Sequence, residues 1–201
     1  EEVLRALGHE VPHWPVSVPA RRAELRHRDG ARLLRGLFAG GTLCDEAMLV
    51  AADTLGPIHS NIPLSPELGI EDLDAALSSE THLMLDFGDD ALTQGRAHPM
   101  IDSTLRLEHL SKVVADPRTG AVLLDVVLGH GAEADPAAAL APAIADAVAH
   151  GVPVVVSCVG TTSDPQGLDR QVSAMADAGA EVHLSNASAA RRAVELVGGG
   201  S

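Results

Sequence analysis

The sequence is long enough for one sizeable domain and too acidic to favour a nucleic acid or an anionic membrane as a partner. It has 201 residues, of which 46% are hydrophobic and only 1% aromatic, and its formal net charge is -14. Such an acidic surface repels polyanions, although a local field can still hold a small anion. The scarcity of aromatic residues predicts a core built from Ala, Val, Leu and Ile.

Neither the cysteines nor the hydropathy indicates export or membrane insertion. Cys44 and Cys158 are the only cysteines. They do not form a disulfide framework pattern, which predicts a reducing, cytoplasmic environment. We find no signal-peptide pattern and no apolar run of about 18 residues, so no membrane span is expected.

The first 31 residues are expected to form an extension to the main domain. An amphipathic start at 1–7 leads to 11–19, whose three prolines forbid a continuous helix. Trp14 is expected to pin this arm to the body. Residues 20–30 form a cationic helical patch, for which a solvated helix face is favoured over an anion or partner site.

Five apolar runs alternate with helix-like segments along the rest of the chain. The predicted strands are 33–39, 82–87, 121–128, 153–159 and 181–184. The predicted helices are 43–55, 70–77, 103–115, 136–150, 167–178 and a last one from 186 or 188 to 197, while 56–69 is expected to be irregular. Continuously apolar strands are typical of parallel sheets covered on both faces.

Right-handed crossovers between these elements predict a flavodoxin-like, doubly wound α/β domain. The expected sheet has five parallel strands in the order 2-1-3-4-5, with its switch point between the strands at 33–39 and 121–128. The domain is expected to span 32–197, between the extension at 1–31 and a flexible tail at 198–201.

Glycine turns follow four of the predicted strands. They are Gly40, Gly41 and Thr42 after the first strand, Gly88 after the second, Gly129 to Gly131 after the third, and Gly160 and Thr161 after the fourth. Because the carboxyl ends of parallel strands share one edge, we expect these turns to form a single rim. Thr42 is the expected N-cap of the following helix, and helix N-termini attract anions. The rim therefore predicts a site for a small anion or a partner's loop.

The densest set of ionisable side chains lies between residues 81 and 102. Arg96 is a candidate clamp for a carboxylate or phosphate, and the adjacent Gly95 is a further anion-binding candidate. His98 is a candidate general acid or base, or a phosphoryl acceptor. Asp102 either orients the His98 imidazole or caps the next helix. The competing interpretation is that His98 only shapes its loop.

Three further features have weaker support. His130 lies between two glycines, so it is either a catalytic or ligand-binding residue or a solvent-facing turn residue. Cys44 lies in the first turn of a predicted helix, whose dipole would lower the thiol pKa, but a nucleophile is the minority interpretation. Asp89 and Asp90 lack a spaced third ligand, so no metal site is predicted. No Ser-His-Asp or Cys-His triad is recognisable.

Several segments resemble a known superfamily. They are LMLDFGDD at 83–90, VVADPRTGAVLLDVVLGHGAEAD at 113–135, VPVVVSCVGTT at 152–162 and ADAGAEVHLSNASAARRAVELV at 176–197. Together they look like the flavodoxin-like CoA-ligase domain of the succinyl-CoA synthetase superfamily, with the spacing of the C-terminal domain of its β subunit. Two more segments, RGLFAGGTLCDEA at 35–47 and DFGDDALTQGRAHPMID at 86–102, are closer to the FdrA family.

The resemblance implies activities that the residues alone do not define. FdrA-like proteins are described as acyl-CoA synthetase-like. A role in purine degradation is implied, as the large subunit of an oxamate carbamoyltransferase that exchanges a carbamoyl group between oxamate and carbamoyl phosphate. Carbamoyl phosphate or CoA is then an implied substrate, with no resident cofactor. The alternatives are an acyl-CoA synthetase subunit that forms a thioester through a phosphorylated intermediate, and a non-catalytic scaffold for partner docking.

The resemblance also implies site residues and missing parts. By position it assigns site roles to Gly40, Gly41, Thr42, Gly95, Arg96, His98 and Asp102. The phosphohistidine segment and an ATP-grasp nucleotide site have no counterpart in the sequence. A partner subunit or an N-terminal half is therefore expected, and self-association into a homo-oligomer is also expected.

Overall fold

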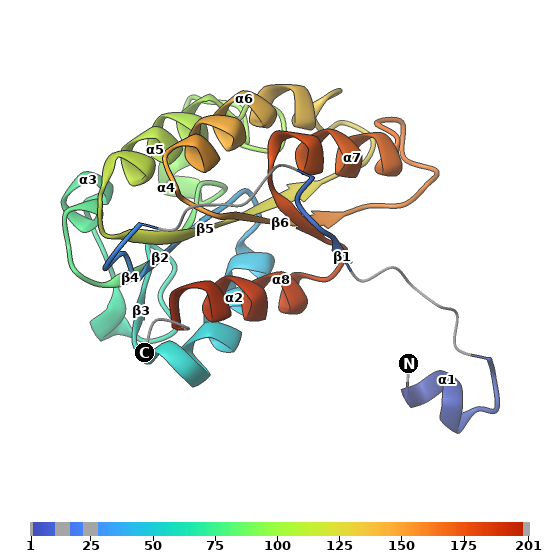
Figure 1. Ribbon diagram of the computed structural model, residues 1–201, viewed down its shortest axis with the longest axis horizontal. Coiled ribbons are helices and arrows are strands. Elements are labelled where there is room, and N and C mark those ends of the chain that lie inside the picture. Colours follow the sequence, from blue (N-terminus) through green and yellow to red (C-terminus); the bar gives the residue numbers. More distant parts are fainter. Residues whose placement is uncertain (1, 11–16, 22–27, 199–201) are drawn as a thin grey trace.

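The described part of the chain forms a twisted sheet with helices on both faces (Figure 1). The computed structural model describes residues 2–10, 17–21 and 28–198. The strands are β1 (Ser17–Val18), β2 (Leu33–Phe38), β3 (Ile58–His59), β4 (His82–Asp86), β5 (Thr119–Val127), β6 (Val154–Val159) and β7 (Glu181–His183). Their order across the sheet is β1-β7-β6-β5-β2-β4-β3. All neighbours are parallel except β1 and β7.

The predicted fold class and strand order are confirmed. The five central strands β4-β2-β5-β6-β7 are the predicted strands in the order 2-1-3-4-5. The switch point lies where expected, because β2 pairs with β4 on one side and with β5 on the other. A ligand in such a fold binds at the carboxyl ends of the strands beside this point.

The prediction of five strands was wrong, since the described residues contain seven. β1 lies in the expected extension and pairs with β7, and β3 lies in the segment expected to be irregular and pairs with β4. That segment also contains the 3-10 helix η1 (Pro66–Leu68). Two-residue strands are too short to produce a periodic pattern, so the sequence does not indicate them.

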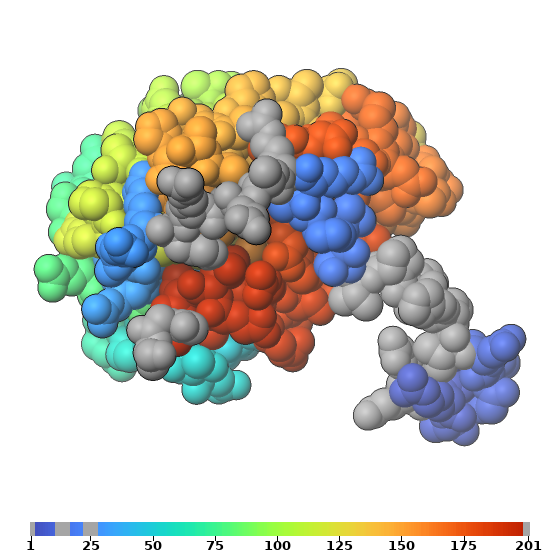
Figure 2. Space-filling view, viewed as in Figure 1, coloured from blue at the N-terminus to red at the C-terminus, as the bar shows by residue number. Residues whose placement is uncertain are grey.

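Helices cover both faces of the sheet (Figure 1). The helices are α1 (Glu2–Ala6), α2 (Gly41–Leu55), α3 (Leu73–Leu77), α4 (Asp90–Thr93), α5 (Thr104–Ala115), α6 (Pro136–Ala149), α7 (Leu168–Ala178) and α8 (Asn186–Gly198). Helices α2 and α8 lie side by side on one face, cyan and red in Figure 2, and α5, α6 and α7 cover the opposite face. Buried Ala189, Ala190 and Ala193 let α8 approach the sheet closely, as the aliphatic composition predicts. No helix in the described ranges is long and apolar enough to cross a membrane.

The cationic patch predicted at 20–30 is described only at its ends. Arg21 forms an exposed ion pair with Asp177, and Arg28 donates to the carbonyl oxygens of Val114, Asp116 and His150. Arg28 therefore caps the C-terminal ends of α5 and α6, which is a favourable place for a cation. The rest of this patch and Trp14 lie outside the described residues.

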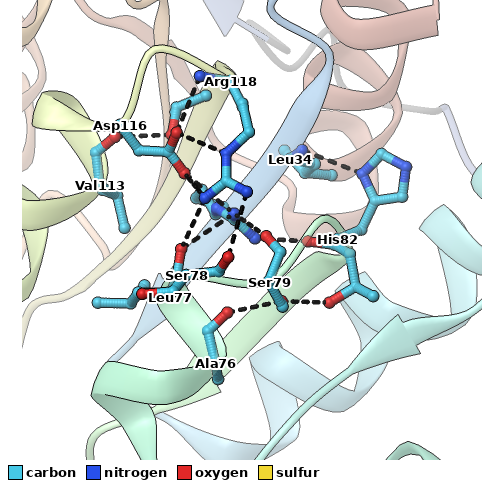
Figure 3. Close-up of polar contacts among 12 residues, drawn as sticks. Leu34, Ala76, Leu77, Ser78, Ser79, His82, Val113, Asp116 and Arg118 are labelled. Carbon is cyan, nitrogen blue, oxygen red and sulfur yellow. Dashed lines mark hydrogen bonds and ion pairs between the residues drawn. The ribbon is translucent and has the colours of Figure 1, made fainter.

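A buried arginine network fixes the segment that leads into β4. Arg35, in β2, is only 1% exposed, and it donates to the carbonyl oxygens of Thr81 and Ser79 and contacts Asp116 at 3.4 Å. Burial lowers the pKa of Arg35, whereas the Asp116 carboxylate opposes that shift. Figure 3 shows Arg118 binding the same Asp116 and donating to Ser78. The two arginines thereby hold the end of α3 and set where β4 begins.

We expect Asp116→Ala to destabilise the protein because it leaves Arg35 buried without its counter-ion. The expected loss in the free energy of unfolding is about 3 kcal/mol, measured by urea denaturation. Adding Arg35→Met should restore the part of this loss that comes from the uncompensated Arg35 charge, while the hydrogen bonds between Asp116 and Arg118 stay lost. Asp177→Ala, which removes the exposed pair with Arg21, is the control and should change little. Equal losses in the two aspartate variants would contradict the account.

Candidate functional site

The parallel strands bring the predicted glycine turns to one edge of the sheet. The turns after β2, β4, β5 and β6 contain, respectively, Gly40 to Thr42, Gly88, Gly129 to Gly131, and Gly160 with Thr161. Because β6, β5, β2 and β4 are consecutive in the sheet, these turns form one continuous rim. Its centre is the β2–α2 turn, at the switch point.

Helix α2 begins at the rim with an uncapped N-terminus. Its N-cap is Gly40, in an extended conformation, and no side chain accepts a hydrogen bond there. The expectation that Thr42 is the N-cap was wrong, because the helix begins at Gly41 and Thr42 lies in its first turn. The first helical hydrogen bond joins the Cys44 N–H to the Gly40 oxygen, so the N–H groups of Gly41, Thr42 and Leu43 have no partner within the helix.

Asp86 ends β4 directly beside this helix terminus. Its side chain is 5% exposed, and its Oδ1 accepts a hydrogen bond of 2.8 Å from the Gly88 N–H. A β-carbon on Gly41 would lie 3.0 Å from Asp86 Oδ2, a tight contact, so glycine lets the helix terminus approach this carboxylate closely without a shift of the side chain. Burial raises the pKa of Asp86, and the neighbouring Asp125 carboxylate raises it further. Asn61 holds the Asp86 backbone through hydrogen bonds of 2.8 and 2.9 Å.

Asp125, in β5, is fully buried on the other side of β2. Its Oδ1 accepts from the Ala39 N–H at 2.7 Å and from the Arg106 guanidinium at 2.8 Å. Its Oδ2 has no hydrogen-bond partner and faces Gly40, where a β-carbon would lie 3.6 Å away. Burial raises the pKa of Asp125, and the Arg106 charge opposes that rise. Two buried carboxylates therefore flank the open terminus of α2.

The geometry of His98 indicates where its proton lies. The Met100 N–H donates to His98 Nδ1 at 3.2 Å, so in the neutral imidazole the proton is on Nε2. Nε2 packs against Gly88: a β-carbon there would lie 2.7 Å from Nε2 and 3.1 Å from Asp86 Oδ1. Half-buried His98 and buried Asp86 are thus neighbours, and Gly88 is needed for their approach.

The other predicted side chains from 89 to 102 lie farther out. Arg96 is exposed, and no side-chain contact is described for it. Gly95 has a φ of 72° in the turn that ends α4, so it has a conformational role. Asp102 accepts from the N–H and hydroxyl of Thr104, the first residue of α5, whose N-cap is Ser103. A catalytic role for Arg96 or Asp102 stays a prediction.

Asp89 and Thr161 make local hydrogen bonds within their own loops. Asp89 caps α4 by accepting from the Ala91 N–H, and Asp90 is the first residue of that helix. The described residues contain no group of three or more His, Cys, Asp or Glu side chains arranged to hold a metal. His130 is exposed in the turn after β5. In the loop after β6, the Thr161 hydroxyl donates a hydrogen bond to the Asp164 carboxylate.

Cys44 is poorly suited to act as a nucleophile. It is fully buried, and burial raises the pKa of its thiol well above the ordinary value, with Asp86 and Asp125 adding to the rise. Burial and the two neighbouring carboxylates raise the thiol pKa by more than the helix dipole, expected from the sequence, would lower it. Burial likewise raises the pKa of Cys158 to about 12.

Sequence reasoning missed Asp86, Asp125 and their partner Arg106 as site residues. The available signal was a single charged residue near the end of each apolar run, in LMLDF and LLDVV. A charge at such a position is rarely buried unless it is paired or functional.

Separate cavities lie away from the rim. One of about 500 Å³ lies between α2 and α8 and is lined by Val50, Thr54, Arg191 and Val194 among others. Another, of about 450 Å³, lies beside α3 and α5 over the Asp116 network. The assignment of a candidate site to the rim therefore rests on its polar groups and not on either of these cavities.

The fold and rim define a doubly wound α/β domain with an open helix terminus at its switch point. Residues 37–196 match the family model described as CoA-ligase, and the chain belongs to this family. It is 36% identical over 172 residues to the uncharacterized protein YahF of Escherichia coli (strain K12). That alignment covers 83% of this chain and 33% of YahF, so the chain spans about a third of the length of this curated relative.

The raised pKa of Asp86 predicts a pH-dependent stability difference between the wild type and Asp86→Asn. Ionisation of Asp86 costs more free energy in the native state than in the unfolded state. This extra cost disappears as the pH falls through the raised native pKa toward the pKa of Asp86 in the unfolded chain. The neutral variant should therefore gain stability relative to the wild type at pH 7, and lose that gain near the ordinary carboxyl pKa of about 3.9. Urea denaturation across this range measures both.

The matched control is Asp90→Asn, which neutralises an exposed carboxylate four residues away. Its stability difference from the wild type should depend much less on pH. A stability difference for Asp86→Asn that does not change with pH would contradict the burial argument.

Proposed function

We propose that this domain supplies the anion-binding face of a CoA-ligase-type enzyme that activates a small carboxylate as an acyl phosphate and transfers the acyl group to the CoA thiol. The observation that carries this proposal is the uncapped terminus of α2 between Asp86 and Asp125. Membership of the CoA-ligase family supports the reaction class and makes CoA the expected acyl acceptor.

The site residues suit the charge changes of such a transfer. The CoA sulfur forms a bond to the acyl carbon, the carbon–oxygen bond to phosphate breaks, and phosphate leaves with the electron pair and receives the thiol proton. The N–H groups of Gly41, Thr42 and Leu43 would stabilise the charge that phosphoryl oxygens gain if the phosphate binds at this terminus, and the dipole of α2 would add to their effect. The Nε2–H of His98 would donate a hydrogen bond to the leaving phosphate, which takes the thiol proton, and a general acid or base role for His98 stays a prediction.

Carbamoyl transfer between oxamate and carbamoyl phosphate is the second candidate. It rests on the resemblance of the segments 35–47 and 86–102 to the FdrA family. Carbamoyl phosphate is also a mixed anhydride of a carboxylic acid and phosphoric acid, so the same helix terminus would suit it. The family description names CoA-ligase and no carbamoyltransferase, which makes this candidate, and a role in purine degradation, the less supported one.

The domain is proposed to work with further parts. Because it spans only 33% of YahF, the remaining functions would come from the rest of a longer chain or from a partner subunit. A non-catalytic docking role for the rim is the alternative from another class. The domain limits of 32–197, a homo-oligomeric assembly and a cytoplasmic location stay predictions.

Calorimetric titration with separate ligands distinguishes these proposals. The chain is titrated with acetyl phosphate, carbamoyl phosphate, oxamate and CoA in turn. Binding of acetyl phosphate and CoA supports acyl transfer, whereas binding of carbamoyl phosphate and oxamate without CoA supports carbamoyl transfer. If none of the four binds, the catalytic proposals fail for this chain alone and partner docking is favoured.

We expect Thr42→Pro to weaken acetyl phosphate binding because it removes one of the three free N–H groups of α2. Proline is tolerated in the first turn of a helix, so α2 should remain intact. The expected loss is roughly tenfold or more, the range for one hydrogen bond to a charged group. Thr42→Val removes the hydroxyl but keeps the N–H, and it should bind as the wild type does. Equal weakening in both variants would remove the α2 N–H groups from the site.

The predicted clamp role of Arg96 has a separate test. Because its side chain is exposed, Arg96→Ala should leave the stability unchanged. If Arg96 folds over the rim to bind the anion, the variant should bind acetyl phosphate about tenfold more weakly in the same titration. Unchanged affinity would remove Arg96 from the site and leave the α2 terminus as its main anion-binding group.

A further inference from the structure

The turn that carries His130 has unusual backbone freedom. His130 lies between Gly129, with a φ of 151°, and Gly131, with a φ of 86°. Residues with side chains rarely adopt such conformations, and glycines lose the most backbone entropy when they become ordered. A Gly-His-Gly turn at the edge of a sheet would not hold the imidazole in one place unless other contacts restrain it.

Gln166 supplies that restraint from the neighbouring loop between β6 and α7. Its side chain is 3% exposed. Oε1 accepts from the Gly129 N–H at 3.2 Å, and Nε2 donates to the Gly129 oxygen at 2.8 Å and to the Glu133 oxygen at 3.1 Å. One amide side chain thus binds both backbone polar groups of Gly129, and both of its own hydrogens have partners.

The same contacts continue to the loop that carries His98. The Glu133 N–H donates to the Met100 oxygen at 2.7 Å, and the Met100 N–H donates to His98 Nδ1. Glu133 therefore joins Gln166 on one side to Met100 on the other. These hydrogen bonds link the loops after β4, β5 and β6. The series begins at the side chain of Gln166, passes through the backbones of Glu133 and Met100, and ends at the side chain of His98.

A second glutamine contacts Gln166 through the backbone oxygen of Gln166 and not through its side-chain amide. Gln171, in α7, is fully buried and donates to the Gln166 oxygen at 3.3 Å. It also accepts from the Ala137 N–H at 2.7 Å and donates to Asp135, so it holds the start of α6. Gln171 makes no described hydrogen bond to Gly129 or Glu133, so the two glutamines have separable roles.

We propose that Gln166 is a positioning residue that orders the His130 turn and joins it to the His98 loop, so that both histidines face the rim in one fixed arrangement. The importance of this arrangement for ligand binding rests on the proposed function. The ordering of the turn by Gln166 does not, because it follows from the hydrogen bonds alone.

The test compares Gln166→Glu with Gln171→Glu in the full chain. Glutamate at 166 keeps an acceptor for the Gly129 N–H but places a carboxylate against two carbonyl oxygens. Both variants add the same charge to the same network, which makes the second the control. Amide hydrogen exchange at Gly129 should become about tenfold faster in Gln166→Glu, the effect of losing local hydrogen bonds, and change less than twofold in Gln171→Glu.

Two more readouts separate a positioning role from a merely structural one. The NMR signals of the His130 ring should shift and broaden in Gln166→Glu only. Acetyl phosphate should bind that variant about tenfold more weakly, while Gln171→Glu should keep the wild-type affinity. Gln166→Met, which removes all three of these side-chain hydrogen bonds without adding a charge, should repeat both results and serves if the glutamate variant does not fold.

Each outcome decides one claim. Gly129 exchange within twofold of the wild type in Gln166→Glu or Gln166→Met overturns the ordering role. Faster exchange with unchanged acetyl phosphate affinity overturns the positioning role for ligand binding. If wild-type protein binds no acetyl phosphate, the proposed function fails, and the exchange and NMR results alone still decide whether Gln166 orders the turn.

Discussion

The structure depends on the burial of one carboxylate, that of Asp125, at the switch point of the sheet. Its Oδ1 joins three elements: it lies in β5, accepts from the backbone at the end of β2, and pairs with Arg106 of α5. Removing a charge from water is costly unless it is paired, so these partners are energetically coupled. The β2–α2 turn is therefore held against β5 by a charged contact and not by apolar packing alone.

The rim also has an uncapped helix terminus near its centre, that of α2. Helices α3, α4 and α6 have aspartate side chains that accept from their first N–H groups, namely Asp72, Asp89 and Asp135. At α2 the corresponding position is Gly40, whose missing side chain leaves space beside Asp125. A capping side chain there would satisfy the N–H groups and block an incoming anion. Gly40 leaves these N–H groups without a side-chain cap, between the buried carboxyl groups of Asp86 and Asp125.

The fold could be predicted from the sequence because long apolar runs and glycine turns agreed. Right-handed crossovers indicated a parallel sheet, and the order of its central strands is the flavodoxin-like one that was expected. The short strands β1 and β3 could not be predicted, because two residues have no period and their pairing depends on distant partners. Thr42 was misplaced since its hydroxyl suits an N-cap, whereas the extended backbone of Gly40 decides where α2 begins.

The candidate site was only partly accessible from the sequence. Glycine turns are local signals, so the rim could be inferred once the strands were parallel. The roles of Asp86, Asp125 and Gln166 depend on contacts between loops that are far apart in the chain, such as the 37 residues between Gly129 and Gln166. Arg96 and Asp102 attracted attention through charge density, but charge density does not report burial, and both are exposed.

The most direct test of the central claim is a map of backbone amide chemical shifts by NMR during titration with acetyl phosphate. The account predicts that the largest changes occur at the N–H groups of Gly41, Thr42 and Leu43, with smaller ones near His98. Saturable changes confined to another helix terminus, such as that of α7, would contradict it and move the anion site away from the switch point.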